Sequence, residues 1–272
     1  MTSLARSNFS SAAAFVSARR AGASLKIYPG PKPQDLVAAY RIQDEAIRLW
    51  NGSIGGWKVG RILPPFASAF GEDRLVGPIF ADQIQRTGAS IVEMPVFEGG
   101  FAAVEGEFVI LLRDDAPAGK TVWSDAEGRA LIAAVHAGIE VASSPYPRIN
   151  DDGPLVTISD FGNNAGLLIG PELPNWRDFD LPSWTVETYL DGVPVGSGAA
   201  TGIPGGPVDS LRAALAICAR RGRPLRRGMA VSTGAVSGVH EARIGQTAEV
   251  RFAGLSTLRC TMATARAMVS PA

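Results

Sequence analysis

Two kinds of hydrophobic periodicity divide the chain. Over residues 33–50 the apolar positions recur at roughly helical intervals, and Asp35 stands near the start of this pattern, where an N-cap is expected. From residue 55 onward the apolar residues come in short runs broken by Gly and Pro, which is typical of strands and loops. We therefore predict a helical N-terminal region over 1–54, beginning with a basic, Ala-rich helix, and a β-rich region over 55–272 that packs with it as one compact unit.

Strands should dominate the second region because its apolar runs are short and rich in β-branched and aromatic residues. The clearest run is 101–112, and Asp191-Gly192 predicts a hairpin turn after a strand at 185–190. Helical spacing predicts helices at 125–136, with Ser124 as N-cap, and at 208–220. The sequence therefore predicts an α+β fold, and the other expected strands are 57–60, 76–80, 90–94, 138–142, 166–169, 229–232, 248–252 and 258–262.

Composition narrows the functional classes. The chain has 272 residues, 46% hydrophobic and 19% charged, with 31 Gly and 19 Pro, which describes a turn-rich globular protein rather than a disordered or fibrous one. Lys plus Arg number 26 and Asp plus Glu also number 26, so no global positive field attracts nucleic acid. The sequence has no window of 18 uninterrupted apolar residues, so we expect no membrane span.

Two features bear on the compartment. Cys218 and Cys260 lack the spacing of a disulfide framework or thiolate metal site, so a reducing, cytoplasmic compartment is expected. Residues 1–34 carry several Arg but no Asp or Glu, which loosely fits a mitochondrial transit peptide. An ordinary basic first helix accounts for the same residues, and we favour that interpretation.

Common catalytic signatures are missing from the sequence. It contains no phosphate-binding GxxxxGK[ST], no GxSxG nucleophile elbow and no HExxH zinc motif. The only histidines, His136 and His240, each have an ordinary structural alternative, so we assign neither a role.

A pair of acids in the strongest strand candidate points to metal chemistry. On a strand, residues i and i+2 face the same side, so Glu105 and Glu107 place two carboxylates side by side in an apolar run. Gly106 between them leaves the opposite face open to close packing. A third acid, Glu140, interrupts another apolar strand candidate. Three oxygen ligands suit Mg²⁺ or Mn²⁺, although an exposed strand face bearing acids is the alternative.

Two further polar residues stand in apolar surroundings. Lys58 is a lone cation in a Gly-bounded strand candidate, and near an acidic site it is a candidate electrophile or proton carrier. Its ordinary alternative is a solvated strand lysine. Asp160 enters a Gly- and Asn-rich turn, where an aspartate most often serves the turn itself.

The candidate residues fall in a series of short sequence blocks. In chain order these blocks are Gly56-Trp57-Lys58-Val59-Gly60, Gly71-Glu72-Asp73-Arg74, Gly77-Pro78-Ile79-Phe80, Val104-Glu105-Gly106-Glu107-Phe108, Gly138-Ile139-Glu140-Val141, 160–170, Gly196-Ser197-Gly198-Ala199-Ala200 and Ser232-Thr233-Gly234-Ala235. Each block alone is a weak signal, but the ordered combination spans most of the chain and is specific. With these blocks in this order, the chain resembles the 2-keto-4-pentenoate hydratase group of the fumarylacetoacetate hydrolase superfamily.

The resemblance implies a β-rich mixed roll preceded by a helical region, and a homodimer or higher homo-oligomer. It implies that Glu105, Glu107 and Glu140 hold the metal. It also implies that Lys58 and Asp160 line the pocket as catalytic residues. Thr233 is then expected to contact the substrate carboxylate.

Three departures from the group's pattern fall in the substrate blocks. Arg61-Ile62-Leu63 stands where a small hydroxyl-bearing residue often follows the block that ends at Gly60. Phe161 stands where Asn commonly follows the aspartate. Ile203-Pro204 stands in place of His-Pro. We therefore expect Arg61 and Phe161 to bind substrate in a pocket that is more apolar or differently charged than that of the hydratase acting on the smallest dienoate.

The function that the resemblance implies is hydration of a 2-hydroxy-2,4-dienoic acid to a 4-hydroxy-2-oxo acid. The divalent metal would bind the substrate carboxylate and 2-oxygen and stabilise the enolate, while Lys58 and Asp160 move protons. The same chemistry serves a 2-oxo-3-enedioate decarboxylase of the 4-oxalocrotonate type and an acylpyruvate C–C hydrolase. A non-catalytic binder of small oxo acids is a further alternative. The natural substrate and the preferred metal stay open at this stage.

Overall fold

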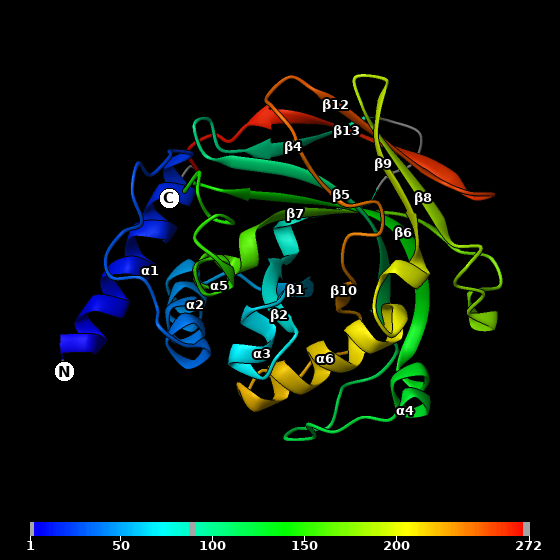
Figure 1. Ribbon diagram of the computed structural model, residues 1–272, viewed down its shortest axis with the longest axis horizontal. Helices are drawn as coiled ribbons and strands as arrows, with labels where there is room; N and C mark the ends of the chain where they lie inside the picture. Colours follow the sequence, from blue (N-terminus) through cyan, green and yellow to red (C-terminus); the bar gives the residue numbers. More distant parts are fainter. Residues whose placement is uncertain (1–2, 87–90, 269–272) are drawn as a thin grey trace.

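Two β-sheets with helices packed beside them make up the protein, and this arrangement confirms the predicted α+β class (Figure 1). The computed structural model describes residues 3–86 and 91–268. In Figure 1 the smaller sheet lies above the long strands of the larger one, and the helices lie below and to the left.

The larger sheet has eight strands in the order β2-β1-β10-β5-β6-β7-β3, with β11 also paired to β5. Most neighbours are antiparallel, while β1 with β10 and β3 with β7 are parallel. Its strands are β1 (Ile54–Arg61), β2 (Arg74–Phe80), β3 (Ile84–Arg86), β5 (Phe101–Leu112), β6 (Ile132–Ser144), β7 (Asn164–Glu172), β10 (Ala230–Ser232) and β11 (Val239–Glu241).

The smaller sheet has five strands in the order β4-β13-β12-β8-β9. The hairpin turn expected at Asp191-Gly192 joins β8 to β9, and both residues have the positive φ that such a tight turn needs. Its strands are β4 (Val92–Val96), β8 (Thr185–Leu190), β9 (Val193–Ala199), β12 (Thr247–Phe252) and β13 (Ser256–Thr264).

The helices form where the sequence offers caps and apolar stripes. Asp35 caps α2 by accepting a hydrogen bond from the Ala38 amide, and Asn51 ends that helix in the left-handed conformation. No helix among the described residues is long and apolar enough to span a bilayer. The helices are α1 (Ser3–Ala21), α2 (Leu36–Trp50), α3 (Phe66–Phe70), α4 (Asp125–Ala130), α5 (Pro154–Ser159) and α6 (Gly206–Arg220), with 3₁₀ turns η1 (Ala81–Gln83), η2 (Phe161–Asn163), η3 (Trp176–Asp178) and η4 (Ala200–Gly202).

One predicted helix is wrong in its second half. Ser124 and Glu127 form the expected capping box, but α4 ends at Ala130 and the next residues begin β6. The strand predicted at 138–142 is therefore thirteen residues long, because β6 pairs with β5 from Leu112 to Phe101. This long ladder satisfies the backbone groups of 132–136 and outweighs the helical preference of their alanines.

The remaining predicted elements are confirmed with small shifts of their ends, apart from the first residue of 90–94, which lies outside the described residues. The sequence patterns did not predict β3, β9, β11, α3 and α5. Each of these is short or Gly- and Pro-containing, so its pattern is too brief to read locally.

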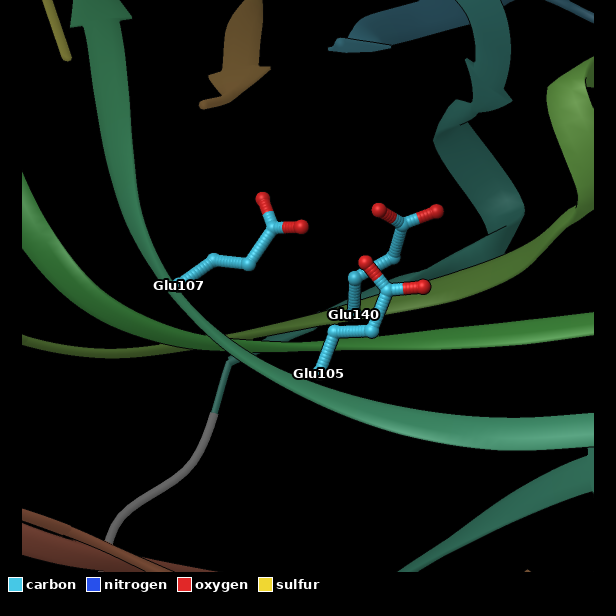
Figure 2. A group of neighbouring side chains, drawn as sticks. All are labelled: Glu105, Glu107 and Glu140. Carbon is cyan, nitrogen blue, oxygen red and sulfur yellow. The ribbon is translucent and has the colours of Figure 1, made fainter. Parts of the chain in front are cut away.

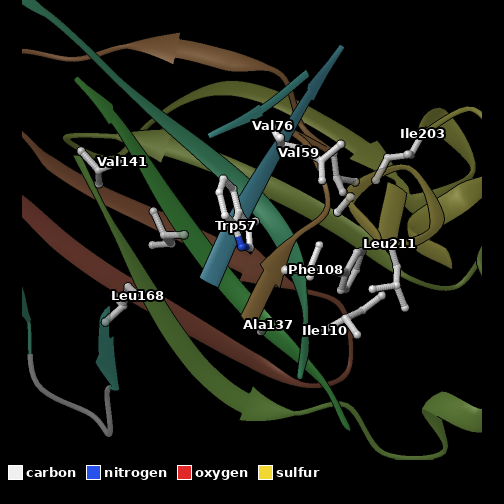
Figure 3. Close-up of a cluster of buried hydrophobic side chains, with 14 of the residues drawn as sticks. Trp57, Val59, Val76, Phe108, Ile110, Ala137, Val141, Leu168, Ile203 and Leu211 are labelled. Atoms are coloured by element: carbon white, nitrogen blue, oxygen red, sulfur yellow. The ribbon is translucent and has the colours of Figure 1, made fainter. Parts of the chain in front are cut away.

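The main core lies around the larger sheet and includes side chains from α2, α6 and both sheets (Figure 3). Trp57 of β1 and Phe108 of β5 are 1% exposed, and Leu211 of α6 is fully buried. Each such side chain contributes roughly 1.5–3 kcal/mol through burial. The β1 and β5 backbones that carry the polar blocks are therefore held rigidly by the core.

Gly106 is a point of close approach between β5 and the smaller sheet. A Cβ on Gly106 would lie 2.6 Å from Val186 Cγ1 and 2.8 Å from Val250 Cγ1, on strands β8 and β12. Because side chains alternate along a strand, Glu105 and Glu107 point away from this packed face. The close contact expected opposite the two acids is therefore present.

We expect Gly106→Ala to destabilise the protein by roughly 1–3 kcal/mol, because the added methyl group overpacks two rigid valines. Gly202→Ala is the matched control, since a Cβ there meets nothing within 4 Å. Urea unfolding followed by circular dichroism measures both. Equal midpoints for the two variants would contradict the close packing of the sheets.

Candidate metal centre and active site

The pairing of β5 with β6 assembles three acids on one face of the larger sheet. Glu105 lies directly opposite Glu140 in the antiparallel register, and Glu107 follows two positions along β5. The three side chains point to the same side of the sheet (Figure 2). One carboxylate oxygen from each lies within 4.8 Å of the others. Glu107 and Glu140 are fully buried and Glu105 is 6% exposed, so the acids do not form an exposed strand face.

Each of the two fully buried carboxylates is held by one oxygen only. Glu107 Oε2 accepts hydrogen bonds from Ser232 Oγ at 2.5 Å and from the Gly234 amide at 2.9 Å. Glu140 Oε1 accepts one from Asn164 Nδ2 at 2.9 Å. Within the described part of the chain, Glu107 Oε1 and Glu140 Oε2 are buried without a hydrogen-bond partner.

The partnerless oxygens fit a hard divalent cation. Buried acceptors without partners are rare in folded proteins, and carboxylate oxygens are the ligands that Mg²⁺ and Mn²⁺ prefer. Burial, and then repulsion from Glu140, raise the pKa of Glu107 well above its usual range. Burial likewise raises the pKa of Glu105 to about 7, while Lys58 acts in the opposite direction. A bound cation would remove this repulsion.

Lys58 projects from β1 toward the acids. It is 6% exposed, and its Nζ lies 3.2 Å from Glu140 Oε1. Burial opposes its charge, but the carboxylates of Glu140, Glu105 and Glu107 outweigh burial and raise the pKa of Lys58. Lys58 is therefore a buried, charged ammonium group and not a solvated strand lysine.

A cavity of about 550 Å³ opens onto Lys58 and Glu105. This volume is in the range of small-molecule sites. Apolar side chains from the β1–α3 connection and polar groups of 150–163 form its walls. The lining includes Arg61, Leu63, Pro64, Phe66, Asn150, Asp151, Thr157, Asn163, Gly234 and Val239.

Asp160 and Phe161 lie elsewhere than the pocket-lining positions expected for them. Asp160 is fully buried, with its Oδ1 2.6 Å from Arg19 Nε and its Oδ2 accepting a hydrogen bond from Ser144 Oγ at 2.6 Å. Phe161 packs edge-on against Trp50 and Phe80 in the core. Neither residue is part of the described cavity lining. Their neighbours Asn163 and Asn164 reach the site instead.

Thr233 is also shielded from the cavity. Its hydroxyl donates to the Phe108 carbonyl at 2.8 Å, and the residue is 1% exposed. The next residue, Gly234, lines the cavity and donates to Glu107. The contact between Thr233 and the substrate carboxylate therefore stays a prediction of the resemblance.

The remaining departures divide between the cavity and the core. Arg61 and Leu63 line the cavity, as expected for substrate contacts. Ile62, however, is buried in a separate apolar cluster, and Ile203 belongs to the main core. Only the first departure therefore changes the character of the cavity wall.

Three residues of the site were missed by sequence reasoning. Ser232 and Asn164 hold the buried acids, and Arg19 holds Asp160. Ser232 and Asn164 stood within the matching blocks but carried no chemistry of their own. Arg19 was one of the several Arg of residues 1–34, and nothing in the local sequence pairs it with Asp160.

The chain is similar to curated hydratases over most of its length. It is 28% identical over 239 residues to the TodF product hydratase of Pseudomonas putida, covering 85% of both chains. It is also 28% identical over 231 residues to a 2-keto-4-pentenoate hydratase of Burkholderia vietnamiensis, covering 84% of this chain and 86% of that one. No protein-family model matches the chain.

Solved structures share the fold. A 4-oxalocrotonate decarboxylase from Pseudomonas putida, complexed with magnesium and adipate, matches with a TM-score of 0.77 and 18% identity over 94% of this chain and 97% of that one. A fumarylpyruvate hydrolase from Pseudomonas aeruginosa, complexed with Mn²⁺ and pyruvate, matches with a TM-score of 0.53 and 17% identity over 76% and 88%. The comparisons confirm the fold of the fumarylacetoacetate hydrolase type and the resemblance to a hydratase-like enzyme.

We expect Glu107→Gln to weaken Mn²⁺ binding at least about tenfold, because the amide keeps the shape of the side chain but removes a ligand charge. Glu105→Gln and Glu140→Gln should act in the same direction. Glu241→Gln is the control, since Glu241 is exposed on neighbouring β11. Calorimetric titration with Mn²⁺ measures the affinities, and unchanged affinity in all three site variants would contradict the assignment of a metal centre.

Proposed function

We propose that the protein is a divalent-metal-dependent hydratase that converts a 2-hydroxy-2,4-dienoic acid to a 4-hydroxy-2-oxo acid. The observation that carries the proposal is the buried triad of Glu105, Glu107 and Glu140 with Lys58 beside it, at a cavity of small-molecule size. Curated relatives that are named hydratases and match most of the chain support the same reaction.

The metal would be held by Glu105, Glu107 and Glu140, with Mg²⁺ or Mn²⁺ as the candidate ions. When bound, such a cation supplies Lewis-acid stabilisation of negative charge on substrate oxygens. The protein keeps the carboxylates of Glu107 and Glu140 in place through hydrogen bonds from Ser232, Gly234 and Asn164 to the oxygen of each that is not left free. This pre-arranged support means that little reorganisation is needed when substrate enters.

Lys58 is the residue that we propose to carry a proton. The reaction first needs a proton to leave the 2-hydroxyl group and one to arrive at the terminal carbon of the diene, after which water adds to the enone. Lys58 lines the cavity, and its charged ammonium group lies in a site largely closed to solvent. Asp160 is engaged by Arg19 and Ser144, so we propose that it supports the site's structure and does not exchange protons with substrate.

The apolar part of the cavity wall is suited to the hydrocarbon end of the substrate. Leu63 and Phe66 line the cavity and are 54% and 44% exposed in the free protein. An alkyl substituent that covered these side chains would gain burial energy, at about 25 cal/mol for each Å² removed from water. We therefore propose that substituted dienoates are preferred over the unsubstituted acid.

We expect Lys58→Met to lower kcat for dienoate hydration by roughly 10²–10⁴-fold, the usual contribution of a positioned proton carrier. Loss of the dienoate's ultraviolet absorbance with Mg²⁺ or Mn²⁺ present measures turnover, and circular dichroism checks folding. Lys26→Met serves as the control because Lys26 is exposed on the N-terminal region. A Lys58→Met enzyme with the wild-type kcat would exclude this role.

A second candidate, decarboxylation of a 2-oxo-3-enedioate, is favoured by Arg61. Arg61 lines the cavity, and among the described residues its guanidinium has neither an ion pair nor a hydrogen bond. Such a cation matches a second, distal carboxylate. The structurally similar decarboxylase contains adipate, itself a dicarboxylate. Asp151 also lines the cavity, and its negative charge is opposite to that of Arg61.

Arg61→Gln separates the two candidates. If the substrate is an enedioate, we expect KM for the dicarboxylic acid to rise by up to about fivefold, because one exposed ion pair with substrate, worth up to about 1 kcal/mol, is lost. KM for monocarboxylic dienoates should change little. Arg61→Lys should keep most of the affinity. Consumption of monocarboxylic dienoates alone, with no change on Arg61→Gln, would leave only the hydratase.

The expected assembly follows from the same resemblance, whereas the expected compartment follows from the cysteines. Both cysteines are buried free thiols, which supports a reducing, cytoplasmic location. We propose that the protein forms a homodimer or higher homo-oligomer, as the resemblance implies, and acts on a small 2-oxo or 2-hydroxy acid.

A further inference from the structure

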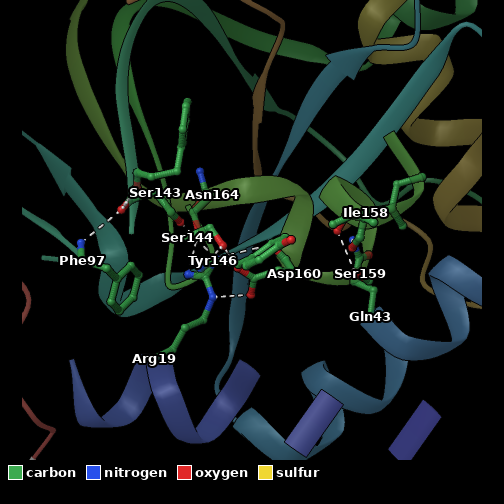
Figure 4. A network of polar contacts seen from close by, with 12 residues as sticks. Arg19, Gln43, Phe97, Ser143, Ser144, Tyr146, Ile158, Ser159, Asp160 and Asn164 are labelled. Atoms are coloured by element: carbon green, nitrogen blue, oxygen red, sulfur yellow. Dashed lines mark hydrogen bonds and ion pairs between the residues drawn. The ribbon is translucent and has the colours of Figure 1, made fainter. Parts of the chain in front are cut away.

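Arg19 of α1 reaches into the β-rich region and joins segments that are far apart in sequence (Figure 4). Its Nε lies 2.6 Å from Asp160 Oδ1, and its Nη2 lies 2.9 Å from Asp160 Oδ2. The guanidinium also donates to the carbonyls of Asn164 at 3.0 Å and Ser143 at 3.1 Å. Only 2% of the side chain is exposed. One buried group therefore ties α1 to the end of β6 and to the segment that enters β7.

That segment has an unusual backbone. Phe161, Gly162 and Asn163 have φ values of 55°, 65° and 66°, a run in the left-handed region where two of the three residues are not glycine. Such a run persists only where its surroundings hold it. Arg19 supplies this support at Asp160 and Asn164, on both sides of the run, and its guanidinium lies 5.0 Å from the centre of the Phe161 ring.

Gly162, Asn163 and Asn164 each reach a different part of the candidate site. Gly162 packs beside Lys58, because a Cβ there would lie 3.2 Å from Lys58 Cδ. Asn163 lines the cavity. Asn164 Nδ2 donates to Glu140 Oε1 at 2.9 Å. The turn at 160–164 therefore packs against the Lys58 side chain, forms part of the cavity wall and supplies the hydrogen bond to Glu140.

We propose that Arg19 is a positioning residue for the metal centre, acting through the 160–164 turn and Asn164 on Glu140. The N-terminal helix is then a functional part of the site and not a detachable appendage. Asp160 acts as the anion that receives Arg19. The inference rests on the proposed function only for activity, since metal affinity reports on Glu140 without any substrate.

The experiment measures Mn²⁺ affinity by calorimetric titration, without substrate, for Arg19→Gln, Asn164→Ala and a control. We expect the dissociation constant to rise about tenfold in both site variants, which is typical when the support of a metal ligand is lost. Arg20→Gln is the matched control, because the neighbouring Arg20 ties α1 to α2 through the Leu49 and Trp50 carbonyls. We expect it to keep the wild-type affinity.

Conservative variants separate positioning from folding. Arg19→Lys retains the charge but not the forked geometry, so we expect it to behave like Arg19→Gln. If Arg19→Gln does not fold, the two single variants Asp160→Asn and Asn164→Ala provide the test instead. A folded Arg19→Gln or Asp160→Asn protein with wild-type Mn²⁺ affinity would overturn the proposal, and so would unchanged affinity in Asn164→Ala.

Activity provides the second readout. With saturating Mn²⁺ and a substrate that the wild-type protein consumes, we expect kcat of Arg19→Gln to stay about tenfold lower, because the turn that packs on Lys58 is also displaced. A wild-type kcat at saturating metal would contradict this part of the inference. If no dienoate or enedioate is consumed by the wild-type protein, the proposed function fails, while the Mn²⁺ titrations still decide the role of Arg19.

Discussion

Three carboxylates are buried together where β5 pairs with β6, and this concentration of negative charge governs how the groups around the site are arranged. Burial and repulsion from neighbouring carboxylates disfavour the ionised forms of Glu105 and Glu107, as their raised pKa values indicate. The surrounding groups compensate part of this buried negative charge. Lys58 brings a positive charge from β1, and Asn164 donates to Glu140. A divalent cation bound by the free carboxylate oxygens would compensate the remaining negative charge. The site is therefore suited to a metal ion whether or not substrate is present.

The alternation of side chains along β5 couples this site to the core. Glu105 and Glu107 face the site, while Gly106 between them faces the smaller sheet at distances where a methyl group would not fit. The same strand therefore serves close sheet packing on one side and metal chemistry on the other. Because β5 pairs with β6 along its length and packs against the smaller sheet at Gly106, the backbone fixes the relative positions from which the three carboxylates project, and Ser232, Gly234 and Asn164 then hold Glu107 and Glu140.

The helical region joins the site through a second buried ion pair. Removing one partner of such a pair leaves an uncompensated charge, which is why Arg19 and Asp160 are best understood together. The pair also explains why Asp160 and Phe161 differ from the sequence-based expectation. With Asp160 directed toward α1, Phe161 packs in the core and the following asparagines take the places facing the cavity and Glu140.

Features that depend on neighbouring residues along the chain could be predicted from the sequence. The i, i+2 acids around Gly106 follow from the period of a strand, and the caps at Asp35 and Ser124 follow from local hydrogen bonding. Tertiary structure decided the rest. Residues 132–136 became strand because β5 was available to pair with them, and the same register set Glu140 opposite Glu105. Arg19 meets Asp160 across 141 positions of the chain, so the direction of that side chain depends on how α1 packs, which no local pattern encodes.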